Sequence, residues 1–104
     1  MDNVIYKRDS YIVFKACGGY VIYNQNKDFQ VGHTHFKSFK KAKSCIDLVI
    51  RHKIPQSESI RFLGSLKRLS DNKEYCDNIE VLIQTKKQKG KKDKYYNRGN
   101  FKND

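Results

Sequence analysis

The sequence predicts an α+β protein in which a three-stranded antiparallel sheet is followed by about three helices and a disordered basic C-terminal tail. Two strand-like segments flank a Gly-Gly pair near the N-terminus, which is typical of a hairpin. Three later segments repeat apolar residues at helical spacing, and the last residues are highly charged without apolar periodicity. Because 104 residues accommodate one core, we expect a single domain over residues 1–87 and a tail over residues 88–104.

The hairpin is predicted by two segments rich in β-branched and aromatic residues. The first is YIVFKAC, residues 11–17, and the second, YVIYN, begins at Tyr20. Gly18 and Gly19 between them can adopt positive φ without steric cost, so we expect a type I′ or II′ turn. Residues 24–28 predict the next turn, and the alternation in FQVGHTHF, residues 29–36, predicts the third strand.

The first predicted helix follows Ser38, whose side chain can cap it. We expect it to end before Pro55, because the residue before a proline is disfavoured in the helical region. Its basic residues lie away from an apolar stripe at spacings of three and four. That stripe contains Phe39, Ala42, Cys45, Ile46, Val49 and Ile50.

Two further helices are predicted before the tail. The second covers residues 58–69, with Ser57 as its cap and a seam of Ile60, Leu63, Leu66 and Leu69. The third follows Ser70 and Asp71, with Glu74 in a capping-box-like position. Its apolar face contains Tyr75, Ile79, Leu82 and Ile83, and the helical pattern fades after Lys87.

The charge of the chain favours a polyanionic partner. The net charge is +11, from 22 Lys and Arg against 11 Asp and Glu, and residues 86–104 hold eight of these basic residues and two of the acidic ones. Such an excess is typical of proteins that bind nucleic acid, the acidic face of another protein or an anionic membrane. We expect no membrane partner, because the longest nearly apolar run, CIDLVI, is too short to span a bilayer.

The cysteines favour a reducing compartment. Cys17, Cys45 and Cys76 are odd in number and widely spaced, with no Cys-x-x-Cys pair, and no signal peptide precedes them. We therefore expect a cytoplasmic protein in which a buried cysteine acts as a small apolar residue.

Two groups of basic residues are candidates for binding. The first surrounds the beginning of the first helix, where exposed backbone N–H groups favour an anion: Lys37, Lys40, Lys41 and Lys43. The second lies in the tail, where cations alternate with aromatic rings as in single-strand or RNA binding: Lys86, Lys87, Lys89, Lys91, Lys92, Lys94 and Arg98, with Tyr95 and Tyr96. The alternative is a solvated Lys-rich surface. If charge does not drive binding, the next candidate is the sheet face around Tyr11, Tyr20 and Tyr23.

His33 and His35 offer an alternative, catalytic interpretation. These residues are two positions apart on a predicted strand, so their imidazoles should project from one face of the sheet. A zinc site needs a third ligand, and Cys45 and His52 lie near opposite turns of the next helix, so we expect no metal or cofactor. The GHTHF segment resembles RNA-cleaving toxins with a double-stranded-RNA-binding-like fold, in which a Gly-Ser-His stretch provides the general base. In this chain the Ser is missing and no helix precedes the hairpin.

A broader resemblance covers residues 11–85. The segments GGYVIYN, GHTHF and KKAKSCIDLVIRHKIP, with the capped helix pair that follows, resemble small uncharacterised proteins of mobile elements in Gram-positive bacteria, some of which are anti-CRISPR inhibitors.

This resemblance implies a non-catalytic protein that docks on nucleic acid or a ribonucleoprotein, in its most specific form an inhibitor of a CRISPR effector nuclease. Two alternatives stay open. One is a small ribonuclease or toxin that uses His33 and His35. The other is a DNA-binding accessory or regulatory protein of a mobile element, because AP2-like and integrase-arm domains also place a helix after a three-stranded sheet.

Overall fold

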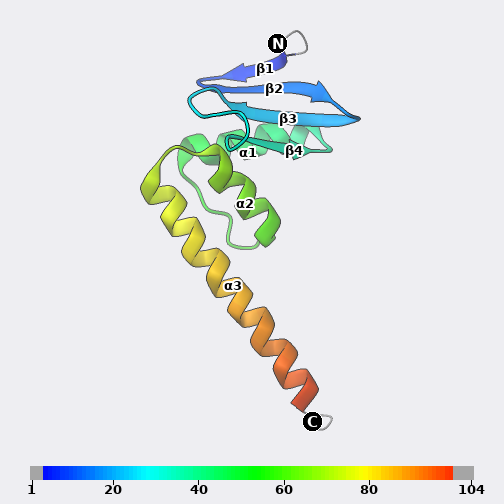
Figure 1. Cartoon of the computed structure of the whole chain (residues 1–104), viewed down its shortest axis with the longest axis vertical. Helices are drawn as coiled ribbons and strands as arrows, with labels where there is room; N and C mark the ends of the chain where they lie inside the picture. Colours follow the sequence, from blue (N-terminus) through cyan, green and yellow to red (C-terminus); the bar gives the residue numbers. More distant parts are fainter. Residues whose placement is uncertain (1–3, 100–104) are drawn as a thin grey trace.

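The sheet has four strands rather than the predicted three. The computed structural model describes the backbone of residues 4–99 and the side chains of residues 4–89. One antiparallel sheet, in the order β1-β2-β3-β4, precedes three helices, so the α+β class is confirmed (Figure 1). The elements are β1 Val4–Arg8, β2 Tyr11–Ala16, β3 Gly19–Asn24, β4 His33–Phe36, α1 Phe39–Arg51, α2 Ile60–Leu69 and α3 Lys73–Gly99.

Strand β1, which the sequence analysis missed, is an edge strand with an irregular pairing. It pairs with β2 alone in the sheet, and its register shifts between Val4 and Tyr6, so a bulge interrupts the alternation that identifies a strand. Val4 and Ile5 are exposed, whereas Tyr6 packs against the core. Asp9, at φ 54°, makes the tight turn into β2, a conformation that Asp tolerates better than most residues.

The predicted hairpin between β2 and β3 is confirmed, with the turn displaced by one residue. Cys17 and Gly18 are its central residues, at φ 51° and 76°, which defines a type I′ turn. Gly19 instead belongs to β3 and pairs with Ala16. A Cβ atom at Gly19 would lie 2.8 Å from the carbonyl oxygen of Phe36, so β4 approaches here too closely for a side chain.

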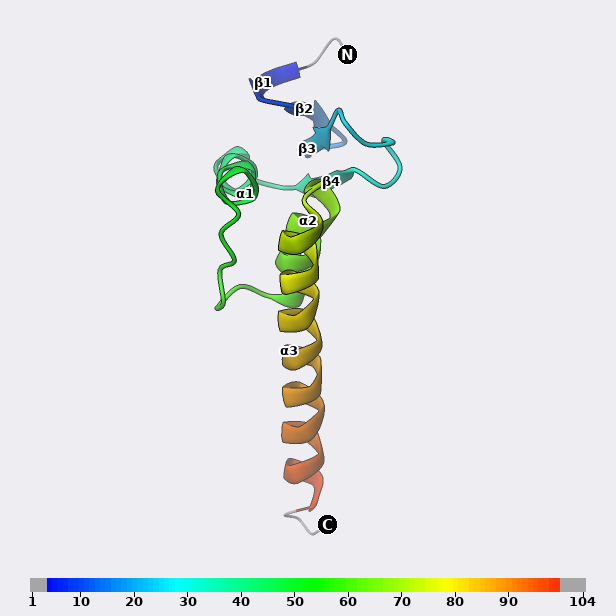
Figure 2. The same cartoon turned by 90° about the vertical axis from the view of Figure 1, so that its left-hand side faces the viewer.

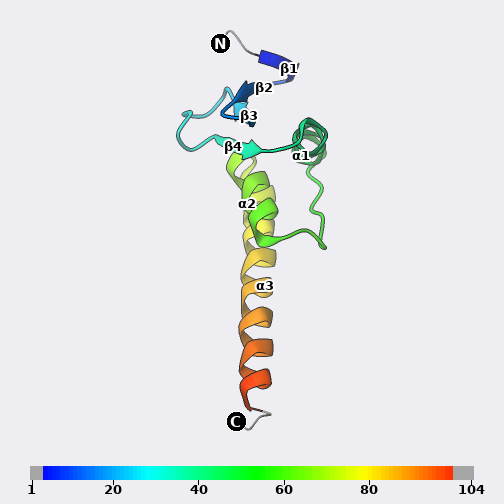
Figure 3. The ribbon, with the colours of Figure 1, turned by 90° about the vertical axis from the view of Figure 1, so that its right-hand side faces the viewer.

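The third predicted strand, over residues 29–36, is confirmed only from His33 to Phe36. The residues before it form a loop because the amides of Val31 and Gly32 both donate to the carbonyl of Asp28, at 3.2 and 2.8 Å. Local turns thus use the backbone groups that a strand would offer to β3. Figures 2 and 3 show α1 on one side of the sheet and this loop on the opposite side.

The helix ends follow the predicted rules, with two corrections. Ser38 caps α1 as predicted, because its Oγ accepts from the amide of Lys41, and α1 ends before Pro55. Helix α2 begins at Ile60 and is capped by Ser59 rather than Ser57. The α3 cap is Asn72, whose Oδ1 accepts from the amide of Tyr75 at 2.8 Å, rather than Ser70 or Asp71. Ser70 is not available as that cap because it closes the C-terminal end of α2.

The core lies between one face of the sheet and the apolar stripes of the three helices. The sheet contributes Tyr11, Val13 and Ile22, and each large apolar side chain that is fully buried stabilises the fold by about 1.5–3 kcal/mol. The helices contribute Ala42, Cys45, Ile46, Val49, Phe62, Leu63, Leu66, Leu69, Tyr75, Ile79 and Ile83. The predicted apolar stripes therefore form the core.

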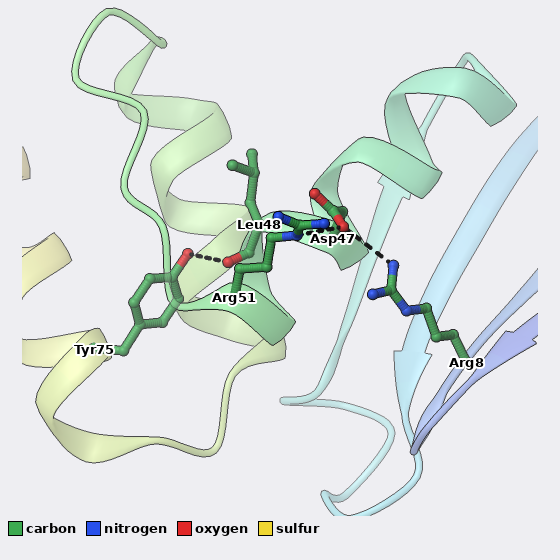
Figure 4. A network of polar contacts seen from close by, with 5 residues as sticks. All are labelled: Arg8, Asp47, Leu48, Arg51 and Tyr75. Carbon is green, nitrogen blue, oxygen red and sulfur yellow. Dashed lines mark hydrogen bonds and ion pairs between the residues drawn. The ribbon is translucent and has the colours of Figure 1, made fainter.

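Polar contacts join α1 to β1 and to α3 (Figure 4). The Asp47 carboxylate accepts from Arg8 of β1 at 3.2 Å and from Arg51 at 3.0 Å through the same oxygen. On the other side, the Tyr75 hydroxyl donates to the carbonyl of Lys53 at 2.7 Å and lies 3.5 Å from that of Leu48. Burial raises the pKa of Tyr75, which keeps this hydroxyl a donor at neutral pH.

We expect Asp47→Asn to weaken the fold at neutral pH and to have no effect in strong acid. The hydrogen bond from Arg8, aided by Arg51, lowers the pKa of Asp47 in the folded protein. The stabilisation is therefore present above the unfolded pKa of about 3.9 and is lost as pH falls through the lower folded pKa. Thermal unfolding from about pH 2 to 7 measures this. Asp77→Asn, which breaks a more exposed pair with Lys73, is the control and should change little. Parallel pH profiles for wild type and Asp47→Asn would contradict the expectation.

Helix α3 projects away from the rest of the molecule in all three views (Figures 1, 2 and 3). Its backbone is helical as far as Gly99, whereas the sequence predicts a disordered tail over residues 88–104. Residues 100–104 lie outside the described residues, and disorder of the tail in solution stays a prediction. Lys and Gln are good helix formers, but a helix in water without an apolar contact is marginal. Within residues 4–99, no helix is long and apolar enough to cross a membrane.

We expect truncation after Lys87 to leave the fold intact, because the last core residue of α3 among the described side chains is Ile83. The melting temperature should change by less than about 2 °C. Any binding to nucleic acid should become weaker and less salt-dependent for every sequence alike, because the six basic residues that follow Lys87 are removed. Sharp, dispersed amide signals with strong exchange protection across residues 88–104 of the full chain would contradict the predicted disorder.

Candidate nucleic-acid interface

The beginning of α1 forms the first basic site. Lys37, Lys40 and Lys41 line a shallow hollow of about 510 Å³ together with Phe36, Ser38 and Ser44. The N-terminal end of α1 carries the positive end of the helix dipole. The Ser38 side chain accepts from the amide of Lys41, and the other amides of the first turn have no partner four residues earlier within the helix. This arrangement favours an anion.

The four predicted lysines of this region do not all line the same hollow. Lys41 pairs with Glu58 at 2.9 Å, and its ammonium lies 4.5 Å from the centre of the Phe62 ring. Lys43 points instead towards β1, with its ammonium 5.2 Å from the Tyr6 ring and 5.4 Å from that of Phe39. The structure thus brings Lys37, Lys40 and Lys41 together and separates Lys43 from them.

A second basic site, which the sequence analysis missed, lies in the groove between α2 and α3. Arg61, Lys67 and Arg68 of α2 and Lys87 of α3 line a hollow of about 490 Å³, and Glu80 is the acidic residue in its lining. Lys67 pairs with Glu80 at 2.6 Å, and this hydrogen bond raises the pKa of Lys67.

The signal for this groove was present in the segment IRFLGSLKRL, which has three cations and no acid. The predicted second helix rests on the apolar seam of this segment alone. No atom lies within 4 Å of where a Cβ of Gly64 would stand, so the groove is open at this point of α2.

Arg68 connects this groove to β4. Its Nε donates to the carbonyl of His33 at 2.9 Å and its Nη2 to that of Gln30 at 2.8 Å. Lys27 donates in return to the carbonyls of Arg68 and Ser70, at 2.7 and 3.0 Å. The loop over residues 25–32 is therefore fastened to the C-terminal end of α2.

His33 and His35 share one face of the sheet, as predicted. Their rings meet edge to face with centroids 5.1 Å apart. The ring of His33 also stacks on Phe29 at 4.3 Å, and its Nδ1 lies 2.5 Å from the Phe29 carbonyl oxygen. Phe29 in turn contacts Tyr23 and Phe14, at centroid distances of 5.2 and 6.3 Å. We call this group the aromatic cluster: Phe14, Tyr23, Phe29, His33 and His35.

The three strand tyrosines do not share a face, in contrast to the expectation from the sequence. Tyr20 pairs in register with Lys15, two residues along β2 from the core residue Val13, so it lies on the helix-covered face. Tyr11 belongs to the core, and its burial raises its pKa to about 12. Tyr23, three residues after Tyr20, lies on the opposite face with the aromatic cluster.

The candidate third metal ligands do not approach the two histidines. Cys45 is buried in the core, where burial raises its thiol pKa to about 12, and His52 packs against Tyr75. In the part of the chain that the structure describes, no three His, Cys, Asp or Glu residues are grouped so that they could hold a metal ion.

The predicted binding residues of the tail, Lys86 to Arg98, lie on α3. Lys86 is half-buried, Lys89 is exposed, and Lys87 lines the α2–α3 groove. The remaining candidates have a described backbone, and their side chains lie outside the described residues: Lys91, Lys92, Lys94, Tyr95, Tyr96 and Arg98.

Comparisons with protein-family models, with curated proteins and with solved structures found no match. A proposal about function therefore has to rest on the chemistry of these surfaces.

Proposed function

We propose that this protein is a small basic, non-catalytic binding protein that docks on nucleic acid or a ribonucleoprotein. The observation that carries the proposal is the surplus of positive charge in the α2–α3 groove. Lys67 and Glu80 neutralise each other there, whereas Arg61, Arg68 and Lys87 have no acidic residue in the lining to balance them. Cations that line one groove without matching acids are arranged to neutralise consecutive phosphates of a polyanion.

The groove and the hollow at the beginning of α1 are linked through two consecutive residues of α2. Arg61 lines the groove, and the next residue, Phe62, supports the ammonium of Lys41 in the hollow. Basic residues from three helices therefore line these two hollows. An arginine fork in such a surface can bind a phosphate through two parallel hydrogen bonds.

The contact between the two histidines supports a binding role. Cleavage of a phosphodiester by two histidines needs a base and an acid on either side of the reacting phosphate. His33 and His35 touch each other, and the Nδ1 of His33 already bonds to the Phe29 carbonyl. The alternative of a small ribonuclease rests on this same pair, since both imidazoles lie at one exposed edge of the sheet.

The most specific form of the proposal is inhibition of a CRISPR effector nuclease in the cytoplasm of a bacterium that carries the mobile element. It is supported by the resemblance described for residues 11–85 and by the positive surface, which could occupy a site that guide or target nucleic acid normally fills. The free thiols of Cys17, Cys45 and Cys76 are compatible with a reducing compartment. A DNA-binding accessory or regulatory protein of a mobile element is the alternative partner class.

Fluorescence anisotropy with labelled RNA and DNA tests the proposal. Affinity should fall steeply between about 50 and 200 mM salt, with a log-log slope of about 0.7–0.9 per phosphate contacted. Intact probes after incubation support a binder, whereas metal-independent cleavage that is lost in His33→Ala or His35→Ala supports the ribonuclease. Tight binding to an effector complex but not to free nucleic acid would place the partner in a nucleoprotein. No binding to any of these at low salt would refute the proposal.

A further inference from the structure

The aromatic cluster is joined to the α2–α3 groove by Arg68. Aromatic rings are not required for binding phosphates, but they can stack with nucleic-acid bases. We infer that this cluster stacks with bases of single-stranded nucleic acid whose phosphates lie in the α2–α3 groove. The inference rests on the proposed function and narrows it from any nucleic acid to an unpaired strand.

The cluster presents aromatic surface to solvent. Phe29 is 39% exposed, His35 is exposed, and Phe14, Tyr23 and His33 are half-buried. The parallel stack of Phe29 on His33, with an interplanar angle of 2°, holds two flat rings in a fixed orientation. A planar base can extend such a stack, because every base has a π face.

Arg68 brings the cluster and the groove together. It lines the groove, and its guanidinium binds the carbonyls of His33 and Gln30, on either side of the chain turn that leads into β4. A strand of nucleic acid with a phosphate at Arg68 would therefore have its adjacent base next to the His33 ring. On the opposite end of β4, Lys37 follows His35 by two residues and lines the hollow at the beginning of α1. The aromatic rings thus have cations at both ends of the strand.

An unpaired strand fits this surface better than a duplex. The bases of a duplex stack on each other and expose only their edges, so its phosphates could use the groove but its base faces could not reach the aromatic cluster. Stacking on an aromatic side chain adds about 5- to 100-fold in affinity per base. The cluster should therefore give a preference for single strands that charge alone does not provide.

Phe29 also has a structural role, so the test must distinguish the loss of base stacking from a loss of folding. Ile12 and Val21 are buried on the same sheet face as the cluster, although they are not part of the main core. Removal of the Phe29 side chain would break its ring contacts with Phe14, Tyr23 and His33 and loosen the loop. Phe29→Leu keeps an apolar cover and removes the ring. Val31→Ala is the matched control, because Val31 lies on the same loop, is 55% exposed and has no ring that could stack with a base.

The experiment measures anisotropy with four probes of one length and sequence: single-stranded RNA, single-stranded DNA and the two corresponding duplexes. We expect Phe29→Leu and His35→Ala each to weaken single-strand binding by about 5- to 20-fold and to leave duplex binding and the salt slope unchanged. Val31→Ala should bind as the wild type does. Tighter binding of single-stranded RNA than of single-stranded DNA would indicate contacts with the 2′-hydroxyl. Equal affinity for the two would indicate stacking alone. Both results support the inference.

Thermal unfolding of each variant checks that the loop and sheet are retained. Unchanged single-strand affinity in folded Phe29→Leu and His35→Ala, with salt-dependent binding still present, would overturn this inference and leave the proposed function in place. Absence of binding by the wild type to all four probes at low salt would refute the proposed function and this inference with it.

Discussion

Removing four cations from the two basic hollows should weaken nucleic-acid binding by about 600- to 4,000-fold at 0.1 M salt, because each phosphate contact contributes about 5- to 8-fold through counterion release. The selected side chains make no ion pair with an acid in the described part of the chain, so their loss leaves no carboxylate without a partner. They are Lys37, Lys40, Arg61 and Lys87, each replaced by Gln. The log-log salt slope should fall by about 3, which anisotropy titrations at several salt concentrations measure.

A control variant separates the location of these charges from the total charge. It removes four exposed cations that lie outside both hollows and therefore lowers the net charge by the same amount: Lys15, Arg51, Lys53 and Lys73, each replaced by Gln. Because Arg51 and Lys73 have exposed ion pairs with Asp47 and Asp77, thermal unfolding checks that the control variant is folded. General electrostatic attraction would weaken both variants equally, whereas a defined interface would weaken the first far more. Equal affinity of the two variants would contradict the assignment of the interface to α1, α2 and α3.

The fold was predictable wherever a local pattern decides the structure. The helical stripes and the Ser38 cap depend on residues three or four positions apart, and the Gly-rich hairpin depends on a two-residue turn. Strand β1 was not predictable in this way, since its bulge breaks the alternation and its pairing with β2 leaves the other edge open. The alternation of Phe29 and Val31 suggested a longer β4, but the turn at Asp28 places both in the loop.

The candidate interface was predictable only in part because it depends on contacts between distant segments. The lysines around Ser38 were found because they are adjacent in sequence to a helix cap. The groove requires Lys87 of α3 to lie beside Arg61 of α2, and no local pattern states how two helices pack. Arg68 likewise meets His33 across 35 residues of chain, so its link to the aromatic cluster became visible only in the folded structure.

We expect Asn24→Ala to lower the free energy of unfolding by about 2–4 kcal/mol, the largest effect of a single polar substitution in this fold. Asn24 is fully buried at the end of β3. Its amide donates to the carbonyl of Leu69 at 2.8 Å, and its Oδ1 accepts from the backbone amide of Asn26 at 3.0 Å. Alanine leaves both backbone groups without these partners and opens a small cavity, and urea unfolding measures the cost.

The neighbouring Asn26→Ala is the matched control, because Asn26 makes an exposed contact with Asp71 at 3.3 Å and should cost less than about 0.5 kcal/mol. Asn24 also holds the beginning of the loop that carries Phe29, since its side-chain Oδ1, which alanine lacks, accepts from the backbone amide of Asn26. If Asn24→Ala remains folded, its single-strand affinity should therefore fall towards its duplex affinity, while the salt slope that reports the α2–α3 groove stays the same. A stability loss no larger than that of Asn26→Ala would show that the buried amide does not join β3 to the end of α2 in solution.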